Sequence, residues 1–267
     1  MGETLREKVT FENQRGDQLA AVLDYPSQGT STYALFAHCF TCSKDSIAAY
    51  RISQALCDQG IGVLRFDFTG LGGSEGDFAN TNFSSNLQDL LAASDHMRNN
   101  FQAPRILIGH SLGGTAVVAA AKDIPESEAV ATIGAPSEAD YIRHLLGEQA
   151  SRVEASETNE VVIGGRRFQM QKQFLEDVSR HRMEECLVNL DRALLVFHSP
   201  ADDIVGIDQG QRIFELARHP KNFIGLDQAD HLLRDQRDSE YVARILSAWV
   251  SRFLEAPGAE KLVDSSG

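Results

Sequence analysis

The sequence of 267 residues contains no long uninterrupted run of apolar residues. Residues 1–8, MGETLREK, lack the apolar core of a secretory signal peptide. Nowhere do about 18 apolar residues follow one another, so the pattern of a membrane-spanning helix is also missing. Gly2 could begin a myristoylation signal, but Arg6 stands where that signal needs Ser or Thr. We therefore expect a cytoplasmic protein without a membrane partner.

Positive charge is scarce, with 25 Lys and Arg residues against 38 Asp and Glu residues and a formal net charge of −13. Such a field repels nucleic acids and anionic lipids, so we expect no nucleic-acid partner and favour neutral small molecules as substrates. The composition, 42% hydrophobic and 24% charged, is that of an ordinary globular protein. The length alone permits two small domains, but we predict one large α/β domain with an insertion.

Cysteine is also rare, with four residues in the chain. Without a secretion signal, four cysteines predict free thiols in a reducing compartment and no disulfide framework. Cys39 and Cys42 form a C-x-x-C motif, so a redox module based on this pair stays open as an alternative. No cluster of His, Cys and carboxylate residues has the spacing of metal ligands. We expect no metal and no other cofactor.

Short β-rich runs alternate with amphipathic helical segments along most of the chain. The predicted strands are 9–12, 19–25, 33–37, 63–66, 106–108, 129–133, 194–197 and 223–226, and the predicted helices include 47–58, 85–98, 112–121, 210–218 and 240–254. The first two strands have polar alternation and a turn at Gly16 and Asp17, which is typical of an antiparallel edge hairpin. The later strands are mostly apolar. We predict an α/β fold with a mainly parallel eight-stranded sheet, helices on both faces and a ligand site at the carboxyl ends of the strands.

One segment, residues 137–191, breaks this alternation and is longer than a crossover needs. It contains helical stretches and a predicted hairpin, 160–169, that turns at Gly164 and Gly165. We predict a small cap inserted over the active site, with a long crossover of two helices as the alternative. The domain then covers residues 1–255, and residues 256–267 form a flexible tail or the start of a linker.

The strongest chemical signal is the sequence GHSLGG at residues 109–114. It follows the apolar strand 106–108 and precedes a helix-forming run, which is the strand-turn-helix setting of a G-x-S-x-G nucleophile elbow. Gly109 and Gly113 leave room where neighbouring backbone must pass. Ser111 is therefore the predicted nucleophile, and His110 is expected to pack around the turn.

A serine hydroxyl needs a nearby imidazole to take its proton. His231 is the predicted base because it lies in the loop between the last predicted strand and the C-terminal helix. The predicted acid is Asp202, in the loop after strand 194–197, where it would accept the second ring N–H of His231. Asp203 is the main alternative. Asp227 lies near the base in sequence, as does Asp230, and both are expected to cap or solvate that loop.

An oxyanion hole needs two backbone N–H groups directed at one point. Leu112, the residue after the nucleophile, should supply one of them, and the loop 38–42 should supply the other through Phe40. A second loop, 66–76, is dense in glycine but lacks the full dinucleotide fingerprint and a helix directly behind it. We expect it to shape the pocket.

Five motifs, spread over nearly the whole chain, together resemble those of the α/β-hydrolase superfamily. They are H-x-F-T, F-D-x-x-G-x-G-x-S-x-G, G-H-S-L-G-G, H-x-x-x-D-x-x-V and a final D-H. The block 38–45 is similar to the hydrolase half of bacterial proteins in which this domain precedes an osmotically inducible protein C-like domain, which implies a covalently linked partner domain. The loops also resemble those of cinnamoyl and feruloyl esterases, which implies aromatic acyl groups. Cys39 stands where most relatives have Gly, and Ser199 follows His198 where most have His-Gly.

The predicted function is a serine carboxylesterase that acts through Ser111, His231, Asp202 and an acyl-enzyme on short-chain or aromatic acyl esters. The same residues could hydrolyse thioesters, peptides or carbon-carbon bonds, because a fold does not fix a function. A catalytically silent interaction module is the alternative from another class. The sequence leaves open whether the chain forms homo-oligomers.

Overall fold

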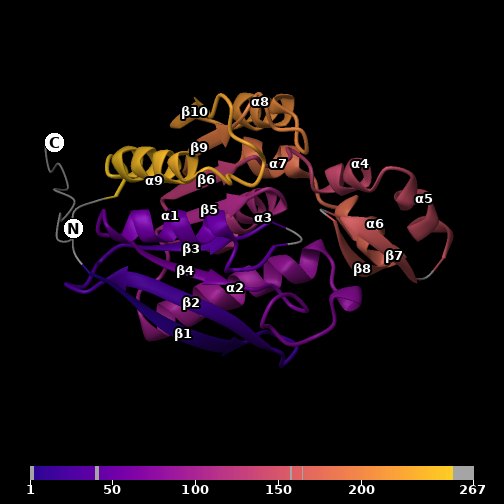
Figure 1. Ribbon diagram of the computed structural model, residues 1–267, viewed down its shortest axis with the longest axis horizontal. Helices are drawn as coiled ribbons and strands as arrows, with labels where there is room; N and C mark the ends of the chain where they lie inside the picture. The colour runs from indigo at the N-terminus through magenta and orange to yellow at the C-terminus, as the bar shows by residue number, and fades with distance from the viewer. Residues whose placement is uncertain (1–2, 40–41, 157, 164, 255–267) are drawn as a thin grey trace, which may run out of the picture.

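The computed structural model describes residues 3–39, 42–156, 158–163 and 165–254, and its main feature is an eight-stranded sheet (Figure 1). The strands are β1 (Thr4–Glu12), β2 (Gln18–Pro26), β3 (Tyr33–Ala37), β4 (Gly62–Phe66), β5 (Ile106–His110), β6 (Ala129–Ile133), β9 (Ala193–His198) and β10 (Lys221–Gly225). Their order across the sheet is β1-β2-β4-β3-β5-β6-β9-β10. All eight predicted strands are present.

The pairing also agrees with the prediction of a mainly parallel sheet. β1 and β2 form an antiparallel hairpin in which Glu12 pairs with Gln18, and β2 is antiparallel to β4. Gly16, in the turn, has a φ of 87°, a conformation that glycine adopts without steric cost. From β4 to β10 every pairing is parallel, so the carboxyl ends of six strands meet at one edge.

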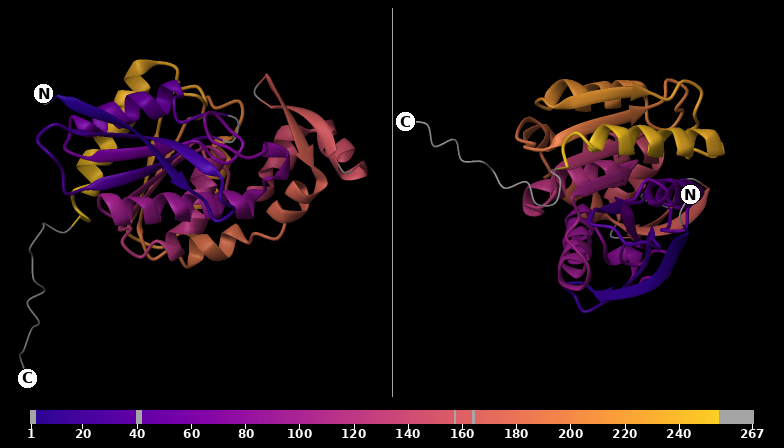
Figure 2. Two further views of the ribbon diagram at one scale, coloured as in Figure 1. Left: turned by 90° about the horizontal axis from the view of Figure 1, so that it is seen from below. Right: turned by 90° about the vertical axis from the view of Figure 1, so that its left-hand side faces the viewer.

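Helices cover both faces of the sheet (Figures 1 and 2). They are α1 (Ile47–Cys57), α2 (Phe83–Asn100), α3 (Leu112–Ala120), α8 (Ile207–Leu216) and α9 (Gln236–Val250), with short 3-10 helices η1 (Phe78–Asn80) and η2 (Ala121–Asp123). Alternate strand residues face opposite sides: Phe36 belongs to the core beneath α1 and α9, whereas Leu35 belongs to the core beneath α2 and α3. No helix in the described part of the chain is long and apolar enough to cross a membrane.

The chain between β6 and β9 forms an insertion of helices and a small separate sheet. It contains η3 (Ala139–Tyr141), α4 (Ile142–Leu146), α5 (Glu148–Ala155), β7 (Thr158–Ile163), β8 (Arg166–Gln171), α6 (Lys172–Val178) and α7 (Met183–Val188). In Figure 1 most of the insertion lies at the right of the molecule, beyond the end of the sheet. Val153, Val161 and Phe174 are buried in the same apolar cluster as α2 and α3, so the insertion packs on the main body. Residues 256–267, the predicted tail, lie outside the described residues.

The prediction of four free thiols is wrong for two of them, because Cys39 and Cys42 are joined by a disulfide. The Cys42 N–H donates to the Cys39 carbonyl at 2.9 Å, and this turn brings the two Cα atoms to 5.2 Å. That separation lies within the range a disulfide spans. The prediction rested on the cellular compartment, whereas the outcome depends on this local turn. Cys57 and Cys186 are free.

Candidate active site

Ser111 lies at the sharp turn between β5 and α3. Its φ of 55° and ψ of −130° place a non-glycine residue in the sterically strained region of positive φ. The turn is fixed at the Ser111 backbone, whose N–H donates to the Ile133 carbonyl of β6 at 2.8 Å and whose carbonyl accepts from the Gly114 N–H at 2.8 Å. Ser111 is 6% exposed and lines a pocket, which is where a nucleophile elbow presents its hydroxyl.

The glycines of the elbow are required by close backbone contacts. A Cβ on Gly109 would lie 2.2 Å from the Gly113 carbonyl oxygen. A Cβ on Gly113 would lie 2.5 Å from the carbonyl oxygens of Ala37 and His38, at the end of β3. Gly113 therefore brings the start of α3 directly against the loop that follows β3, which is the loop predicted to complete the oxyanion hole.

His231 and Asp202 lie together as predicted for a base and its orienting acid. The His231 Nδ1 is 2.7 Å from the Asp202 Oδ2, and the two side chains are 7% and 2% exposed. A carboxylate can only accept, so Nδ1 carries the proton of a neutral ring and Nε2 is left as the acceptor. His231 lines the same pocket as Ser111. A Cβ on Gly134 would lie 3.1 Å from the Asp202 Oδ2, so this glycine gives the pair its space.

The Asp202 carboxylate is held in its ionised form. Its other oxygen accepts the backbone N–H groups of Ile204 at 2.9 Å and Val205 at 2.8 Å. Burial by itself would raise the pKa of Asp202, but the hydrogen bond and charge of His231 and the two amides outweigh it and lower the pKa. Asp203, the main alternative for the acid, is exposed at the pocket and does not make the contact with His231 that Asp202 makes.

Two buried histidines fix the loops that carry this pair. His110 Nε2 donates to the His231 carbonyl at 2.7 Å, and His198 Nε2 donates to the Val205 carbonyl at 2.8 Å. Burial, the largest cause in each case, lowers the pKa of His198 and lowers that of His110 to about 4. Both rings are therefore neutral near pH 7. His110 does more than the packing we predicted, and the role of His198 was missed although the H-x-x-x-D spacing contains it.

The structure describes one of the two residues predicted to form the oxyanion hole. Leu112 is the first residue of α3, so its N–H has no carbonyl partner within the helix. Leu112 and Cys39 line the pocket together with Ser111. Phe40, predicted to supply the second N–H group, lies outside the described residues.

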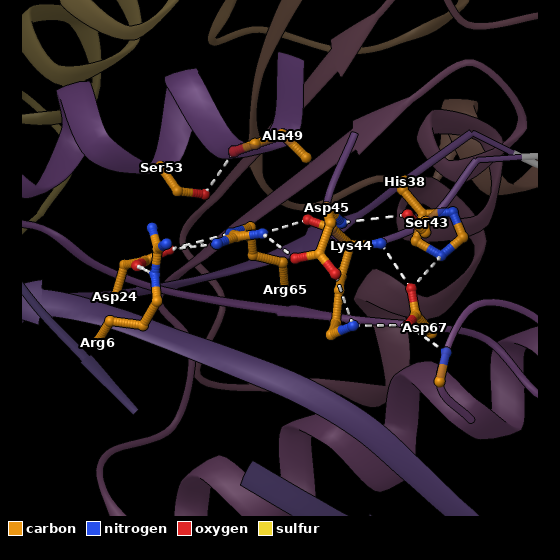
Figure 3. A network of polar contacts seen from close by, with 11 residues as sticks. Arg6, Asp24, His38, Ser43, Lys44, Asp45, Ala49, Ser53, Arg65 and Asp67 are labelled. Carbon is orange, nitrogen blue, oxygen red and sulfur yellow. Dashed lines mark hydrogen bonds and ion pairs between the residues drawn. The ribbon is translucent and has the colours of Figure 1, made fainter. Parts of the chain in front are cut away.

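Asp67, which sequence reasoning did not select, connects the loop after β3 with the glycine-dense loop (Figure 3). Its buried carboxylate accepts the Lys44 backbone N–H at 2.6 Å, the Lys44 Nζ at 2.9 Å and the Gly73 N–H at 2.8 Å. A Cβ on Gly72 would lie 2.2 Å from the Asp67 Oδ2, so the glycine-dense sequence lets this backbone wrap the carboxylate. None of residues 66–76 lines the pocket beside Ser111, so the prediction that this loop shapes the pocket is not confirmed; the loop instead holds the chain that follows β3.

A second buried ion pair continues the network toward the sheet edge (Figure 3). Arg65, on β4 and 1% exposed, bonds the Asp24 carboxylate at 2.9 Å and also donates to the Lys44 carbonyl. Burial would lower the pKa of Lys44, but its bonds to Asp45 and Asp67 raise it, so the amine stays charged. Both the N–H and the carbonyl of Lys44 are thus bonded to buried charged side chains. The loop after β3 is anchored at this residue.

The pocket beside Ser111 and His231 has a volume of about 350 Å³. Apolar side chains of the insertion form part of its wall: Ile142, Leu145, Val162 and Ile163. Charged side chains at the pocket are Asp203, Asp230 and Arg234, of which the last two pair at 3.3 Å. Among the described residues, no group of three or more His, Cys, Asp or Glu side chains could hold a metal ion.

Comparisons with known proteins identify the family to which the chain belongs. A family model described as serine aminopeptidase, S33, matches residues 45–146. The crystal structure of the esterase domain of a Rhodothermus marinus protein is 46% identical, covers 93% of this chain and 99% of its own, and superposes with a TM-score of 0.77. This chain belongs to the α/β-hydrolase family. The predicted fold and family are confirmed.

More distant α/β-hydrolases share the fold. Est1E of Butyrivibrio proteoclasticus, solved with ferulic acid bound, is 19% identical, covers 92% of this chain and 98% of its own, and gives a TM-score of 0.76. Mitochondrial palmitoyl-protein thioesterase ABHD10 of Mus musculus is 23% identical over 242 residues, which are 87% of this chain and 80% of that protein. The hydrolase therefore has both esterases and thioesterases among its relatives.

Proposed function

We propose that this α/β-hydrolase is a serine carboxylesterase that forms an acyl-enzyme on Ser111. The observation that carries the proposal is one pocket lined by a serine at a strained elbow and by a histidine whose Nδ1 is bonded to a buried carboxylate. An elbow alone could be a tight turn, and a His-Asp pair alone could be structural. Their meeting at a single pocket is the arrangement that nucleophilic catalysis needs.

Each residue has a defined role in the proposed reaction. The Nε2 of His231 takes the Ser111 proton as the hydroxyl attacks the ester carbonyl, and Asp202 stabilises the imidazolium that forms. The amides of Leu112 and Phe40 stabilise the oxyanion, helped by the N-terminal dipole of α3. The alcohol leaves with the proton from His231. Water activated by the same ring then releases the acid and restores Ser111.

The pocket favours neutral esters with small apolar or aromatic acyl groups. Its wall is mostly aliphatic, and the carboxylates of Asp203 and Asp230 lie at the same pocket. The net charge of −13 adds to the repulsion of anionic substrates. The 46%-identical relative is an esterase domain, and Est1E was solved with an aromatic acid, ferulic acid, which supports this class.

The insertion acts as a cap in this proposal. Val162 and Ile163 reach the pocket from the hairpin, and Ile142 and Leu145 reach it from α4. A wall built by an insertion can change acyl preference without changing the catalytic residues. We therefore assign the acyl selectivity to the insertion and the catalytic steps to the residues that follow the carboxyl ends of the strands.

A series of p-nitrophenyl esters of increasing acyl length tests the proposal. We expect turnover of short acyl esters by the wild type and a loss of about six orders of magnitude in kcat for Ser111→Ala, the scale seen when a serine protease loses its nucleophile. Ser27→Ala, at an exposed serine that follows β2 and lies outside the pocket lining, is the control. A wild type that hydrolyses none of these esters would contradict the proposal.

Thioester hydrolysis is a second candidate because palmitoyl-protein thioesterase ABHD10 aligns with 87% of this chain. The same triad attacks either carbonyl, so leaving-group selectivity has to be measured. Matched pairs of oxoesters and thioesters with one acyl group, followed by thiol release for the thioester, separate the two. A kcat/KM ratio above about ten in favour of the thioester, more than one kcal/mol at the transition state, would make thioesterase the better description.

A further inference from the structure

The helices of the insertion are tied to one another by Arg143, a residue of α4. Its Nε donates to the Asp140 carboxylate of η3 at 2.6 Å, and its Nη1 donates to the Glu154 carboxylate of α5. Its Nη2 donates to the Leu175 carbonyl of α6 at 2.8 Å. Because packed elements transmit strain, a displacement of α6 also displaces α4, which forms part of the pocket wall.

The hairpin β7-β8 belongs to the same body. Gln149, on α5, accepts the Val162 N–H at 2.8 Å and donates to the Val162 carbonyl at 3.1 Å. Val162 and its neighbour Ile163 line the pocket beside Ser111. The apolar wall that the insertion gives to the pocket is therefore positioned as a whole, and its position depends on how the insertion is attached to the main body.

Asp177, on α6, attaches the insertion to the first turn of α2. Its Oδ2 accepts the Ser84 N–H at 2.8 Å, and its Oδ1 accepts the Ser84 hydroxyl at 2.7 Å. The first N–H groups of a helix lack carbonyl partners within it, and the helix dipole favours a negative charge at this end. The Asp177 side chain is 13% exposed. The insertion thus supplies a capping carboxylate to a helix of the main body.

Neighbouring side chains extend this α6–α2 interface. The Ser84 hydroxyl gives its one proton to Asp177, so its oxygen accepts from the His181 Nε2 at 3.0 Å. Gln173, one turn before Asp177, accepts from the Asn82 Nδ2 at 2.7 Å and donates to the preceding backbone carbonyl at 2.9 Å. Five directed hydrogen bonds therefore fix how α6 sits on the start of α2.

Apolar contacts at this interface are not directional in the same way. Phe168, on β8, packs against Phe78, on η1, with the ring centroids 4.9 Å apart. Such burial favours association but tolerates sliding, because the hydrophobic effect depends on area and not on direction. Asp177, Gln173 and Ser84 do not line the pocket. They can act on a substrate only through the position of the insertion.

We propose that Asp177 is a positioning residue for acyl selectivity. Its bonds to Ser84 hold the insertion where the apolar wall contacts the acyl group, while the catalytic residues remain on the strand ends. This role rests on the proposed ester hydrolysis. Each acyl carbon buried against the wall is worth about fourfold in kcat/KM. Asp177→Ala should lower kcat/KM for a hexanoate ester roughly tenfold, through KM, the equivalent of fewer than two buried carbons. The acetate ester, which is too short to use the wall, should keep its kcat.

The experiment measures kcat and KM for p-nitrophenyl acetate, butyrate and hexanoate with the wild type and three variants. Asp177→Ala should flatten the rise of kcat/KM with acyl length, and Asp177→Asn, whose amide oxygen still accepts the Ser84 N–H, should fall between it and the wild type. Glu176→Ala is the control, because this adjacent carboxylate of α6 pairs with Lys172 of its own helix at 3.5 Å. An unchanged profile in Asp177→Ala, or equal losses for acetate and hexanoate, would overturn the proposal.

Hydrogen exchange tests the attachment without any substrate. In Asp177→Ala, amides of α6 and of the hairpin β7-β8 should exchange faster than in the wild type, while those of β9 should not change. Absence of this difference would also overturn the proposal. If thermal unfolding shows that Asp177→Ala does not fold, Gln173→Ala removes two bonds of the same interface without a change of charge and should flatten the profile less. If the wild type hydrolyses no ester, the esterase function fails, and exchange still reports whether Asp177 holds the insertion.

Discussion

Asp202 and Asp203 are adjacent carboxylates that differ in every contact relevant to catalysis. The Asp202 side chain is 2% exposed, bonds His231 at 2.7 Å and accepts two backbone amides, whereas Asp203 is exposed at the pocket. Sequence reasoning placed the acid in this loop and selected Asp202, with Asp203 as the main alternative. The choice depends on which of the two side chains accepts the backbone N–H groups of residues 204 and 205, and that is a property of the folded loop.

Asp202→Asn should reduce kcat by about four orders of magnitude, because an amide in this position favours the wrong His231 tautomer. Asp203→Asn removes one negative charge from the same loop and should keep kcat for a neutral ester close to wild type. Steady-state kinetics on p-nitrophenyl acetate compares the two variants. Equal losses in both would argue that loop charge, and not the bond to His231, supports catalysis.

His110 links stability to pH because burial lowers its pKa to about 4. The unfolded chain, with an ordinary histidine pKa near 6.5, takes up this proton at a higher pH than the folded chain. The free energy of unfolding therefore falls as pH drops from about 6.5 to 4, by about 3 kcal/mol at most for this residue. The stabilisation is fully present above that window.

Urea unfolding of the wild type and His110→Gln at pH 7 and pH 4.5 measures this linkage. Gln can still donate to the His231 carbonyl but cannot bind a proton. The variant should lose less stability on acidification than the wild type, while His38 and His198, whose pKa values are also lowered by burial, contribute equally to both. Parallel pH dependence in the two proteins would contradict the linkage.

At the scale of elements, every predicted strand of the large sheet is present because apolar periodicity and flanking turns are local signals. The elbow was also predictable, since G-x-S-x-G between a strand and a helix has few other uses. Asp67 and Arg65 were not predictable from sequence. Their partners, Lys44 and Asp24, are 23 and 41 residues away, and only the pairing of β2, β3 and β4 brings them together.

The hairpin β7-β8 tests whether the insertion sets acyl preference. Val162 lines the pocket although its side chain is 46% exposed. Val162→Ala removes two carbons at about 0.8 kcal/mol each and should therefore lower kcat/KM for longer acyl esters about 15-fold at most, with little effect on acetate. Arg167→Ala, on the paired strand and absent from the pocket lining, is the control. An unchanged chain-length profile would place the acyl group elsewhere.

At the scale of the whole molecule, the net charge of −13 and the carboxylates at the pocket both repel anionic substrates. An ester with an anionic acyl group, such as a hemisuccinate, should react more slowly than its neutral analogue at low salt. Because salt screens exposed charges beyond about 10 Å at 0.1 M, added salt should raise kcat/KM for the anionic ester severalfold and leave the neutral ester unchanged. Asp203→Asn should reduce the difference in kcat/KM between the neutral and the anionic ester. Asp123→Asn, in η2 and outside the pocket lining, should leave that difference unchanged.

The central claim is that Ser111 carries the acyl group, and covalent labelling tests it most directly. Wild-type protein, Ser111→Ala and Ser27→Ala are each incubated with a fluorophosphonate and analysed by intact mass and peptide mapping. The account predicts one adduct, located on Ser111, in the wild type and Ser27→Ala, and none in Ser111→Ala. An adduct that persists in Ser111→Ala, or a folded wild type that never labels, would contradict it.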